Sequence, residues 1–179
     1  VEDATTTVDT QVAAEKTAIS LGKADGYQLK SVYMAADFST PATTSDTDIT
    51  SRYDFDTGQK DAYYDLAKIK LKPGQPVPSG RLLVTFDYFT HGAGDYFSVD
   101  SYDGVIDYEN IPSYISAEGK GRLYDLRDCL DFRPRINDAG TGFTGTGGSV
   151  VELPKIGTNV EADFSFYLPR KDNVCIDRL

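Results

Sequence analysis

The sequence contains no tryptophan, one histidine, one methionine and two cysteines among its 179 residues. Cations are also scarce, because 18 Lys and Arg stand against 28 Asp and Glu, and the net charge is -10. Nucleic-acid binding needs clustered cations that displace counterions from phosphates. The densest arginine set, Arg127, Arg133 and Arg135, is interleaved with Asp128 and Asp131. Nucleic acid and anionic membrane surfaces are therefore not expected partners.

No apolar run approaches the ~20 residues that a helix needs to cross a bilayer, and no charged segment followed by an apolar one marks a signal peptide. Cys129 and Cys175 lack the spacing of a metal site. A chain of this length can form a core without disulfides, so two buried reduced thiols are expected, with one disulfide as the alternative. The missing initiator methionine and the apolar end at 173–179 predict a piece of a longer polypeptide.

Short segments of alternating apolar and polar residues recur between turns rich in glycine and proline. The clearest is 82–90, where Leu82, Val84, Phe86 and Tyr88 form one apolar face. This segment is expected to form a hairpin with 96–99 through the loop 91–95. Similar patterns predict further strands at 18–21, 27–35, 63–71, 150–153 and 163–167.

With no clear helix after residue 20 and no internal repeat, these segments predict a mainly β fold, an antiparallel β-sandwich-like domain with long irregular loops. Residues 1–17 are polar and rich in threonine. They are expected to form an extended lead-in from a preceding region, or a short helix packed on the domain. Residues 18–179 are expected to form a single β-rich domain. The expected core residues are Leu29, Tyr33, Ile69, Leu71, Val84, Phe86, Tyr88 and Phe132.

The sequence offers two kinds of catalytic group. His91 is the only possible histidine base; it is expected in a solvated loop or at an interface, with Ser98 as the nearest serine and no Gly-x-Ser-x-Gly motif. Paired carboxylates could cleave glycosidic bonds, but the acids are too numerous for the sequence to single out a pair. The acids considered are Asp54, Asp56, Asp61, Asp65, Asp87, Asp95, Asp100, Asp103, Asp107 and Asp131.

Three loop motifs have features of binding sites. The Asp54-x-Asp56-x-Gly58 run begins like a calcium loop, but Gln59 and Asp65 stand at positions that need Gly and Glu, so a turn capped by Asp56 is favoured. The loop 140–148 has five glycines in nine residues and lacks the Gly-Lys-Thr/Ser ending of a phosphate loop, so a flexible loop or tip is expected. The Arg and Asp residues of 127–135 are expected to pair internally, or to meet a neighbouring subunit. No catalytic, cofactor-binding or metal-binding residue is assigned.

Several segments in a fixed order carry a resemblance that spans residues ~19 to 179. They are 21–25 with 30–33, 50–61, 64–71, 86–91 with 96–102, 126–135 and 167–172. The most distinctive is Asp131-Phe132-Arg133-Pro134. Together they resemble a domain that recurs in large tail-associated structural proteins of T4-like phages, especially phages that infect cyanobacteria.

The resemblance implies a virion structural protein, a component of the tail, baseplate or tail fibre that acts in particle assembly. The expected protein is not an enzyme, binds no cofactor, does not insert into a membrane and is part of the virion after assembly in the host cytoplasm. Its expected partners are other tail or baseplate subunits in a homo- or hetero-oligomer. The alternative is a receptor- or glycan-binding module of a tail fibre, displayed on the glycine tip 140–148 and on Tyr96 and Tyr102.

Overall fold

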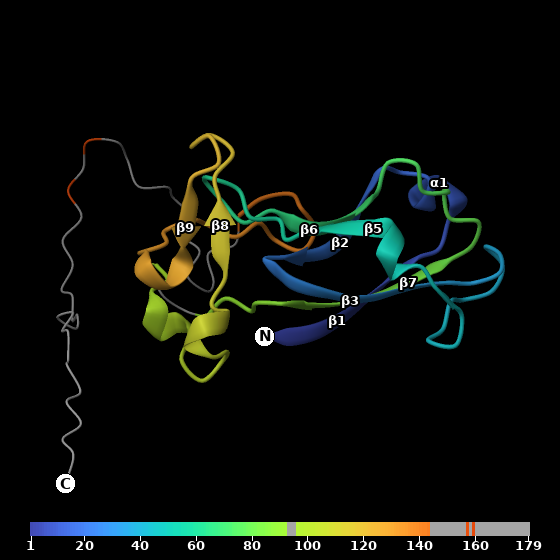
Figure 1. Ribbon diagram of the computed structural model, residues 1–179, viewed down its shortest axis with the longest axis horizontal. Helices are drawn as coiled ribbons and strands as arrows, with labels where there is room; N and C mark the ends of the chain where they lie inside the picture. Colours follow the sequence, from blue (N-terminus) through green and yellow to red (C-terminus); the bar gives the residue numbers. More distant parts are fainter. Residues whose placement is uncertain (93–95, 144–156, 158, 160–179) are drawn as a thin grey trace, which may run out of the picture.

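The computed structural model describes residues 1–92, 96–143, 157 and 159 (Figure 1). The fold is mainly β, as the sequence predicts, with two antiparallel sheets that face each other across a hydrophobic core. One sheet has the order β1 (Glu2–Val8), β7 (Leu82–Tyr88), β3 (Gly26–Met34) and β4 (Thr47–Asp48). The other has the order β2 (Ala18–Ala24), β6 (Leu66–Leu71) and β5 (Tyr53–Asp56).

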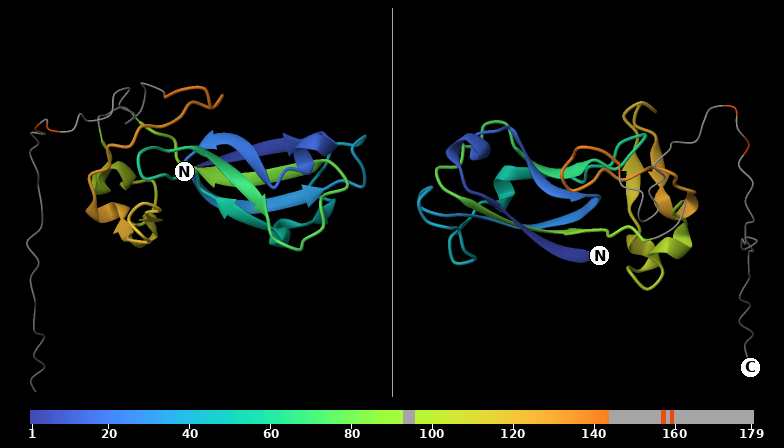
Figure 2. Two further views of the ribbon diagram at one scale, coloured as in Figure 1. Left: turned by 90° about the horizontal axis from the view of Figure 1, so that it is seen from above. Right: turned by 180° about the vertical axis from the view of Figure 1, so that it is seen from behind.

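A smaller part of the chain, residues 96–135, forms a lobe at one end of the sandwich (Figures 1 and 2). The short helix α1 (Gln11–Ala14) lies at the opposite end, and the 3-10 turn η1 (Thr50–Arg52) leads into β5. The lobe consists of 3-10 turns around one two-stranded sheet. Its elements are η2 (Val99–Tyr102), η3 (Tyr108–Asn110), β8 (Ser113–Ile115), β9 (Leu123–Asp125) and η4 (Leu126–Asp128).

The core of the sandwich follows the alternation of its two central strands. Leu82, Val84 and Phe86 of β7 are fully buried and pack in one cluster with Ala67 and Ile69 of β6. Burial of side chains of this size removes about 1.5–3 kcal/mol of unfavourable hydration each. Of the expected core residues, Ile69, Val84 and Phe86 are confirmed as buried, and the half-buried Leu29, Leu71 and Tyr88 pack against the cluster.

Two expected core residues lie elsewhere. Tyr33 is half-buried outside the cluster, because the pairing of β3 with β7 shifts register between Leu29 and Ser31. One extra residue in a strand reverses which side chains face inward, so Val32 fills the core instead. Phe132 belongs to the lobe, where its ring packs on the ring of Tyr96 with the two ring centroids 5.3 Å apart.

The turn between β2 and β3 does not make a hairpin. Among the described residues β2 pairs with β6 alone, whereas β3 pairs with β7 and β4, so the chain passes from one sheet to the other at this point. Asp25 is the single residue between β2 and β3, and its backbone lies in the left-handed region, with φ +55°. Aspartate tolerates this conformation better than most residues because its short side chain can bond locally.

The hairpin expected between 82–90 and 96–99 is wrong, because both edges of β7 are taken. β1 pairs along one edge and β3 along the other. Phe97 instead forms a single antiparallel bridge with Asp131 inside the lobe. The expected strands 150–153 and 163–167 lie outside the described residues.

The amino-terminal stretch belongs to the sandwich. Residues 2–8 are extended, as the sequence predicts, but they form β1 and pair with β7 from Glu2↔Tyr88 to Val8↔Leu82. Val8 is buried in the core, and α1 follows with Ala14 also buried. Thr10 caps this helix by accepting a hydrogen bond from the Ala13 backbone. The stretch is thus an edge strand and a short packed helix of the domain.

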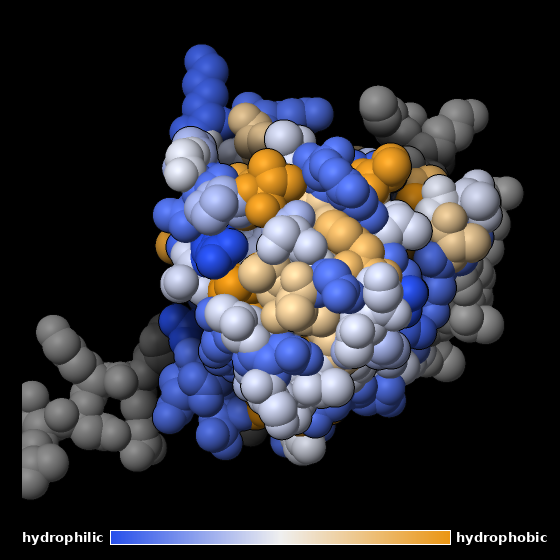
Figure 3. All heavy atoms as spheres, turned by 90° about the vertical axis from the view of Figure 1, so that its right-hand side faces the viewer, coloured by the Kyte–Doolittle hydropathy of each residue, from blue (hydrophilic) through white to orange (hydrophobic). Residues whose placement is uncertain are grey.

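The outer faces of the sandwich are polar. None of the exposed large apolar side chains of the described residues lies on β1 to β7. At the α1 end, apolar residues occupy the middle of the surface among polar neighbours (Figure 3); Val12 and Val77 are exposed apolar residues of this part. Most of the others lie in the lobe, which therefore differs in character from the sheets.

Candidate functional site

A network of charged and polar side chains is buried where the lobe joins the sandwich. It lies between two hydrophobic clusters, the sandwich core and a smaller lobe cluster formed by Phe89, Tyr102, Ile111 and Leu126. Its members come from four separate stretches of the chain. They are Asp25 after β2, Gln59 and Tyr64 before β6, His91 after β7, and Asp131 with Arg133 after η4.

His91 and Asp25 form one half of the network. His91 Nε2 lies 2.8 Å from Asp25 Oδ2, and the side chains are only 3% and 6% exposed. The ring of His91 packs edge-on against Tyr64 and Phe97. The expected solvated position of His91 is therefore wrong: His91 lies in the loop after β7, but its imidazole turns inward to a buried carboxylate.

Arg133 and Asp131 form the other half. Arg133 makes a bidentate pair with Asp131, through Nε–Oδ1 at 2.9 Å and Nη2–Oδ2 at 2.7 Å. It also donates to the Lys60 carbonyl and to the Tyr64 hydroxyl, and its guanidinium lies over the Tyr64 ring. The Tyr64 hydroxyl in turn donates to Asp131. The internal Arg–Asp pairing expected from the sequence is confirmed for this pair.

Gln59 joins the two halves, since its amide nitrogen donates to Asp25 at 3.3 Å while its oxygen accepts from Arg133 at 3.3 Å. The network therefore runs from the β2–β3 crossing to the lobe without a gap. A buried polar group that is satisfied by partners costs far less than an orphaned one. This arrangement fixes the lobe on the sandwich in one orientation.

The charges of the network shift the ionisation of its members. Burial opposes ionisation of Asp131, but the hydrogen bonds and charge of Arg133, together with Tyr64, lower its pKa. Burial also raises the pKa of Tyr64 well above its usual value, and the charges of Asp25 and Asp131 add to this. Asp131 is thus held as a carboxylate and Tyr64 as a neutral donor.

A cavity of about 180 Å³ adjoins the network. Asp25, Tyr64, His91, Ser101 and Tyr102 are among the residues that line it. The Nδ1 atom of His91 is buried and has no hydrogen-bond partner among the described residues. Ser98, the serine nearest in sequence, has its backbone amide bonded to Ser101 Oγ. His91 makes no hydrogen bond to a serine hydroxyl in the described part of the chain.

A second hollow, an open groove of about 790 Å³, runs along the lobe. Three aromatic residues, Tyr114, Tyr124 and Phe132, line it together with Asp61 and Glu118. The Tyr114 hydroxyl donates to Asp61 at 2.6 Å, and burial together with this carboxylate raises the pKa of Tyr114 to about 12. Nothing in the sequence pattern marked this groove, because its lining comes from four segments that are separated along the chain.

The expected turn at Asp56 is confirmed. Asp56 Oδ1 accepts a hydrogen bond from the Gly58 amide at 3.0 Å, and Gly58 has φ +85°. Asp56 pairs with Lys70 at 2.7 Å, and Asp65 pairs with Lys68 at 2.7 Å. Among the described residues, no group of three or more histidine, cysteine or acidic side chains could hold a metal ion.

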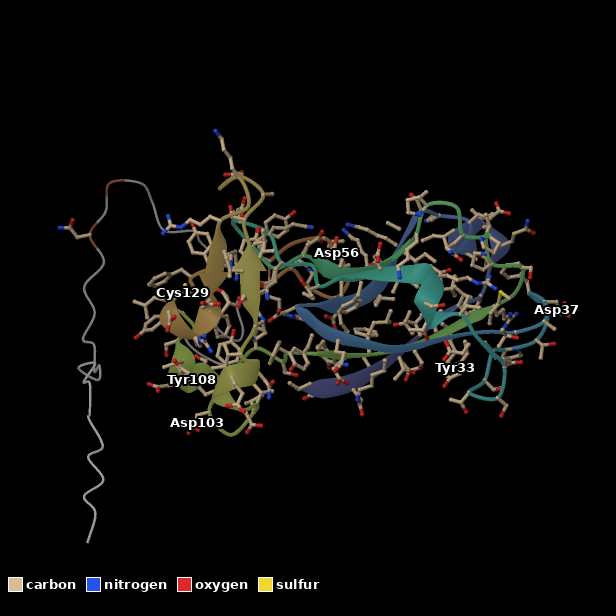
Figure 4. All side chains as sticks on the ribbon, viewed as in Figure 1. Tyr33, Asp37, Asp56, Asp103, Tyr108 and Cys129 are labelled. Carbon is tan, nitrogen blue, oxygen red and sulfur yellow. The ribbon has the colours of Figure 1, made fainter. Side chains whose placement is uncertain are left out.

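The other acidic residues named above are spread over the molecule. Asp54 pairs weakly with Lys72, and Asp87 pairs with Lys30 at 2.9 Å. Asp103 lies in the lobe, far from Asp56 (Figure 4). Asp100 and Asp107 also belong to the lobe, at the 3-10 turns η2 and η3. Asp95 lies outside the described residues.

Several remaining expectations concern the lobe. Arg135 pairs with Asp138 at 2.5 Å, and Arg127 lies over the Tyr108 ring. Cys129 forms no disulfide with the described residues and lies half-buried in the lobe (Figure 4). Burial raises the pKa of the Cys129 thiol, and the charges of Asp131 and Asp128 add to this.

Of the tyrosines expected to display a glycan site, Tyr96 is exposed but Tyr102 is buried, so Tyr102 cannot serve that role. In the loop 140–148, only residues 140–143 are described. Cys175 lies outside the described residues, so its pairing stays a prediction.

No helix of the described residues has the length and apolar character needed to span a membrane. Comparisons of the chain with protein-family models, with curated proteins and with solved structures found no match.

Proposed function

We propose that this chain is a non-enzymatic structural module of a phage virion, a component of the tail, baseplate or tail fibre that acts in particle assembly. The proposal starts from the resemblance described above, whose most distinctive residues are Asp131 and Arg133 with their neighbours. In the structure these two residues bond to each other and to Tyr64 and Lys60, which precede β6, and so attach the lobe to the sandwich. Their role is thus architectural, as expected of a part that must keep its shape within an assembly.

The observation that carries the proposal is the distribution of exposed apolar side chains. Seven of the eleven such side chains of the described residues lie in the lobe. Ile115 and Leu123 are the clearest, since they are direct cross-strand neighbours on β8 and β9 and are 64% and 56% exposed. Clusters of exposed apolar residues mark protein contact surfaces. A module with polar sides and apolar ends is suited to end contacts with neighbouring subunits.

The buried network supports the same proposal. The Asp131 carboxylate and the Arg133 guanidinium form hydrogen bonds with each other. Tyr64 also bonds to Asp131, and Gln59 to Arg133. A general base or nucleophile needs a free atom directed at a substrate. The charged atoms of Asp131 and Arg133 are directed at each other and at neighbouring residues, which makes the junction rigid.

The first test is the location of the chain. Particles purified on a density gradient should contain its peptides at a stoichiometry fixed by the symmetry of the tail, and a reconstruction of the particle should show the sandwich and lobe in the tail region. Detection of the chain in the lysate but not in purified particles would overturn the proposal.

A second test addresses the contact surface. The double substitution Ile115→Asp with Leu123→Asp should lower incorporation of the chain into particles at least several-fold, because it places charge on the exposed apolar pair. Gln28→Asp, on the polar outer face of β3, is the matched control and should be incorporated normally. Equal incorporation of both variants would remove the lobe from the proposed interface.

A further inference from the structure

The groove of the lobe has the dimensions of a ligand site. Its volume is about 790 Å³, within the ~300–1,000 Å³ typical of small-ligand pockets. The groove lies where β8, β9 and η4 meet the segment around Asp61. The exposed pair Ile115 and Leu123 does not line it, so the groove can be tested apart from that pair, although the exposed Leu130 belongs to its lining.

Aromatic rings form a large part of its walls. Tyr114 and Tyr124 are direct cross-strand partners on β8 and β9. A guanidinium lies over each ring, Arg133 at 4.8 Å from the Tyr114 centroid and Arg122 at 4.9 Å from the Tyr124 centroid. These contacts hold the rings in place and leave both tyrosines in the lining of the groove. Held aromatic rings offer flat apolar surface at little cost in conformational entropy.

A fixed acceptor stands beside the rings. Asp61 accepts hydrogen bonds from the Tyr114 hydroxyl at 2.6 Å and from the Glu118 amide at 2.7 Å. A carboxylate has about four lone-pair sites, so Asp61 retains capacity to accept from a ligand. The side chain of Glu118, an exposed residue of the same lining, adds a second carboxylate.

The charge of the lining restricts the ligand. Arg133 is the one cation among the described lining residues, and Asp131 neutralises it at 2.7 Å. Asp61 and Glu118 are left as the net charge of the groove, and they repel anions. A matching ligand must therefore donate hydrogen bonds to carboxylates, present apolar C–H faces to tyrosine rings and carry no negative charge.

We propose that this groove binds a neutral oligosaccharide, with sugar hydroxyls donating to Asp61 and Glu118 and a sugar face packing on Tyr114 or Tyr124. The groove, rather than the glycine tip, is then the carbohydrate site of the chain. The inference goes beyond the assembly role, and a particle component can carry such a site wherever it lies. Its test uses the chain alone, so the outcome is independent of the position of the chain in a particle.

The test begins with an array of neutral, amino and acidic oligosaccharides probed with the full chain. We expect saturable binding to at least one neutral oligosaccharide and no binding to the acidic oligosaccharides. The strongest neutral hit is then titrated by calorimetry against the chain and its variants. Binding to no neutral sugar, or binding to acidic sugars in preference, would overturn the proposal.

Two variants locate the site. Tyr124→Ala and Asp61→Asn should each weaken binding of that oligosaccharide at least tenfold. The matched control is Tyr108→Ala, which removes an exposed lobe tyrosine outside the groove and should leave affinity unchanged. Unfolding midpoints of all three variants establish that they are folded. Full affinity in folded Tyr124→Ala and Asp61→Asn proteins would place the sugar elsewhere and refute the groove.

Discussion

The single histidine is bonded to the residue at which the chain changes sheets. His91 Nε2 lies 2.8 Å from the carboxylate of Asp25, 66 residues earlier, and both side chains are almost fully buried. The backbone adds to the contact, since the Phe89 amide donates to the Asp25 carbonyl at 3.0 Å. The end of β7 and the β2–β3 crossing are thus fastened together by side chain and backbone at the base of the lobe.

Loss of this contact should destabilise the fold. His91→Phe keeps an aromatic ring against Tyr64 and Phe97 but removes the bond to Asp25, so we expect a loss of about 1–3 kcal/mol in urea unfolding. Asp25→Asn removes the charge and keeps a side chain that tolerates the left-handed backbone. The double variant should be less damaged than the sum of the two single variants, with a coupling of about 0.5–3 kcal/mol. Strict additivity would mean that the two side chains do not interact.

Asp131 should make the fold sensitive to acid. Since the folded state lowers its pKa, its contribution is complete above the unfolded pKa of about 4 and is lost as the pH falls through the folded value. Asp131→Asn should cost about 3–5 kcal/mol at pH 7, because it leaves Arg133 buried without its charge partner. Between pH 7 and pH 3 the variant should then lose less stability than the wild type. Asp54→Asn, at an exposed carboxylate, should follow the wild-type curve.

Core packing can be tested with two phenylalanines. Phe86 is fully buried between the sheets, so Phe86→Ala should lower the free energy of unfolding by about 3–5 kcal/mol. Phe132 is half-buried against Tyr96, and Phe132→Ala should cost clearly less. Chemical denaturation measures both, and equal losses would contradict the assignment of Phe132 to the groove rather than to the core.

Gly58 should be less replaceable than Gly74, although both have positive φ, at +85° and +80°. A Cβ on Gly58 would lie 2.1 Å from the Asp65 carbonyl oxygen, whereas one on Gly74 would meet no atom within 4 Å. Gly74→Ala therefore measures the backbone strain alone, about 1–2 kcal/mol. Gly58→Ala adds a steric clash with the backbone. A shared unfolding midpoint for the two variants would show that the β5–β6 connection is looser than the structure indicates.

The sequence predicted which segments form strands better than it predicted which strands pair with one another. The period-2 pattern located β7 and β6 because their buried faces are continuous, and the Asp56 turn was predictable because its bond is local. The register shift in β3 was not predictable, since both Val32 and Tyr33 are apolar enough to occupy a core. Sheet membership also depends on pairings between distant segments, which alternation does not specify.

The buried network at the junction could not be predicted from the sequence for a related reason. Its members, from Asp25 to Arg133, are ordinary polar residues whose partners lie tens of positions away. Only Asp131 and Arg133 are neighbours, and that pair was predicted. The sequence around His91 and Gly92 is typical of an exposed loop. No local feature indicates that the imidazole contacts a buried carboxylate.

The protection of β1 can be tested by amide exchange. Since β7 is its one partner strand in the part of the chain that the structure describes, β1 should show slow exchange at alternate residues from Glu2 to Val8. Strand β4, with two residues on the other edge, is an internal reference and should exchange quickly. Exchange of all β1 amides at the rate of an unfolded chain would restore the picture of a free lead-in.

The partnership of the first strand with a late one also sets the order of events during synthesis. The Glu2 side chain bonds to Tyr88, 86 residues further on, so the sandwich cannot close until β7 has left the ribosome. At ~5–20 residues per second this delay is roughly 4–17 s. During that time β1 has no partner, and its run of three threonines, Thr5 to Thr7, offers little apolar surface to other nascent chains. The polarity that makes this strand hard to recognise in the sequence thus limits its association with other chains until β7 is available to pair with it.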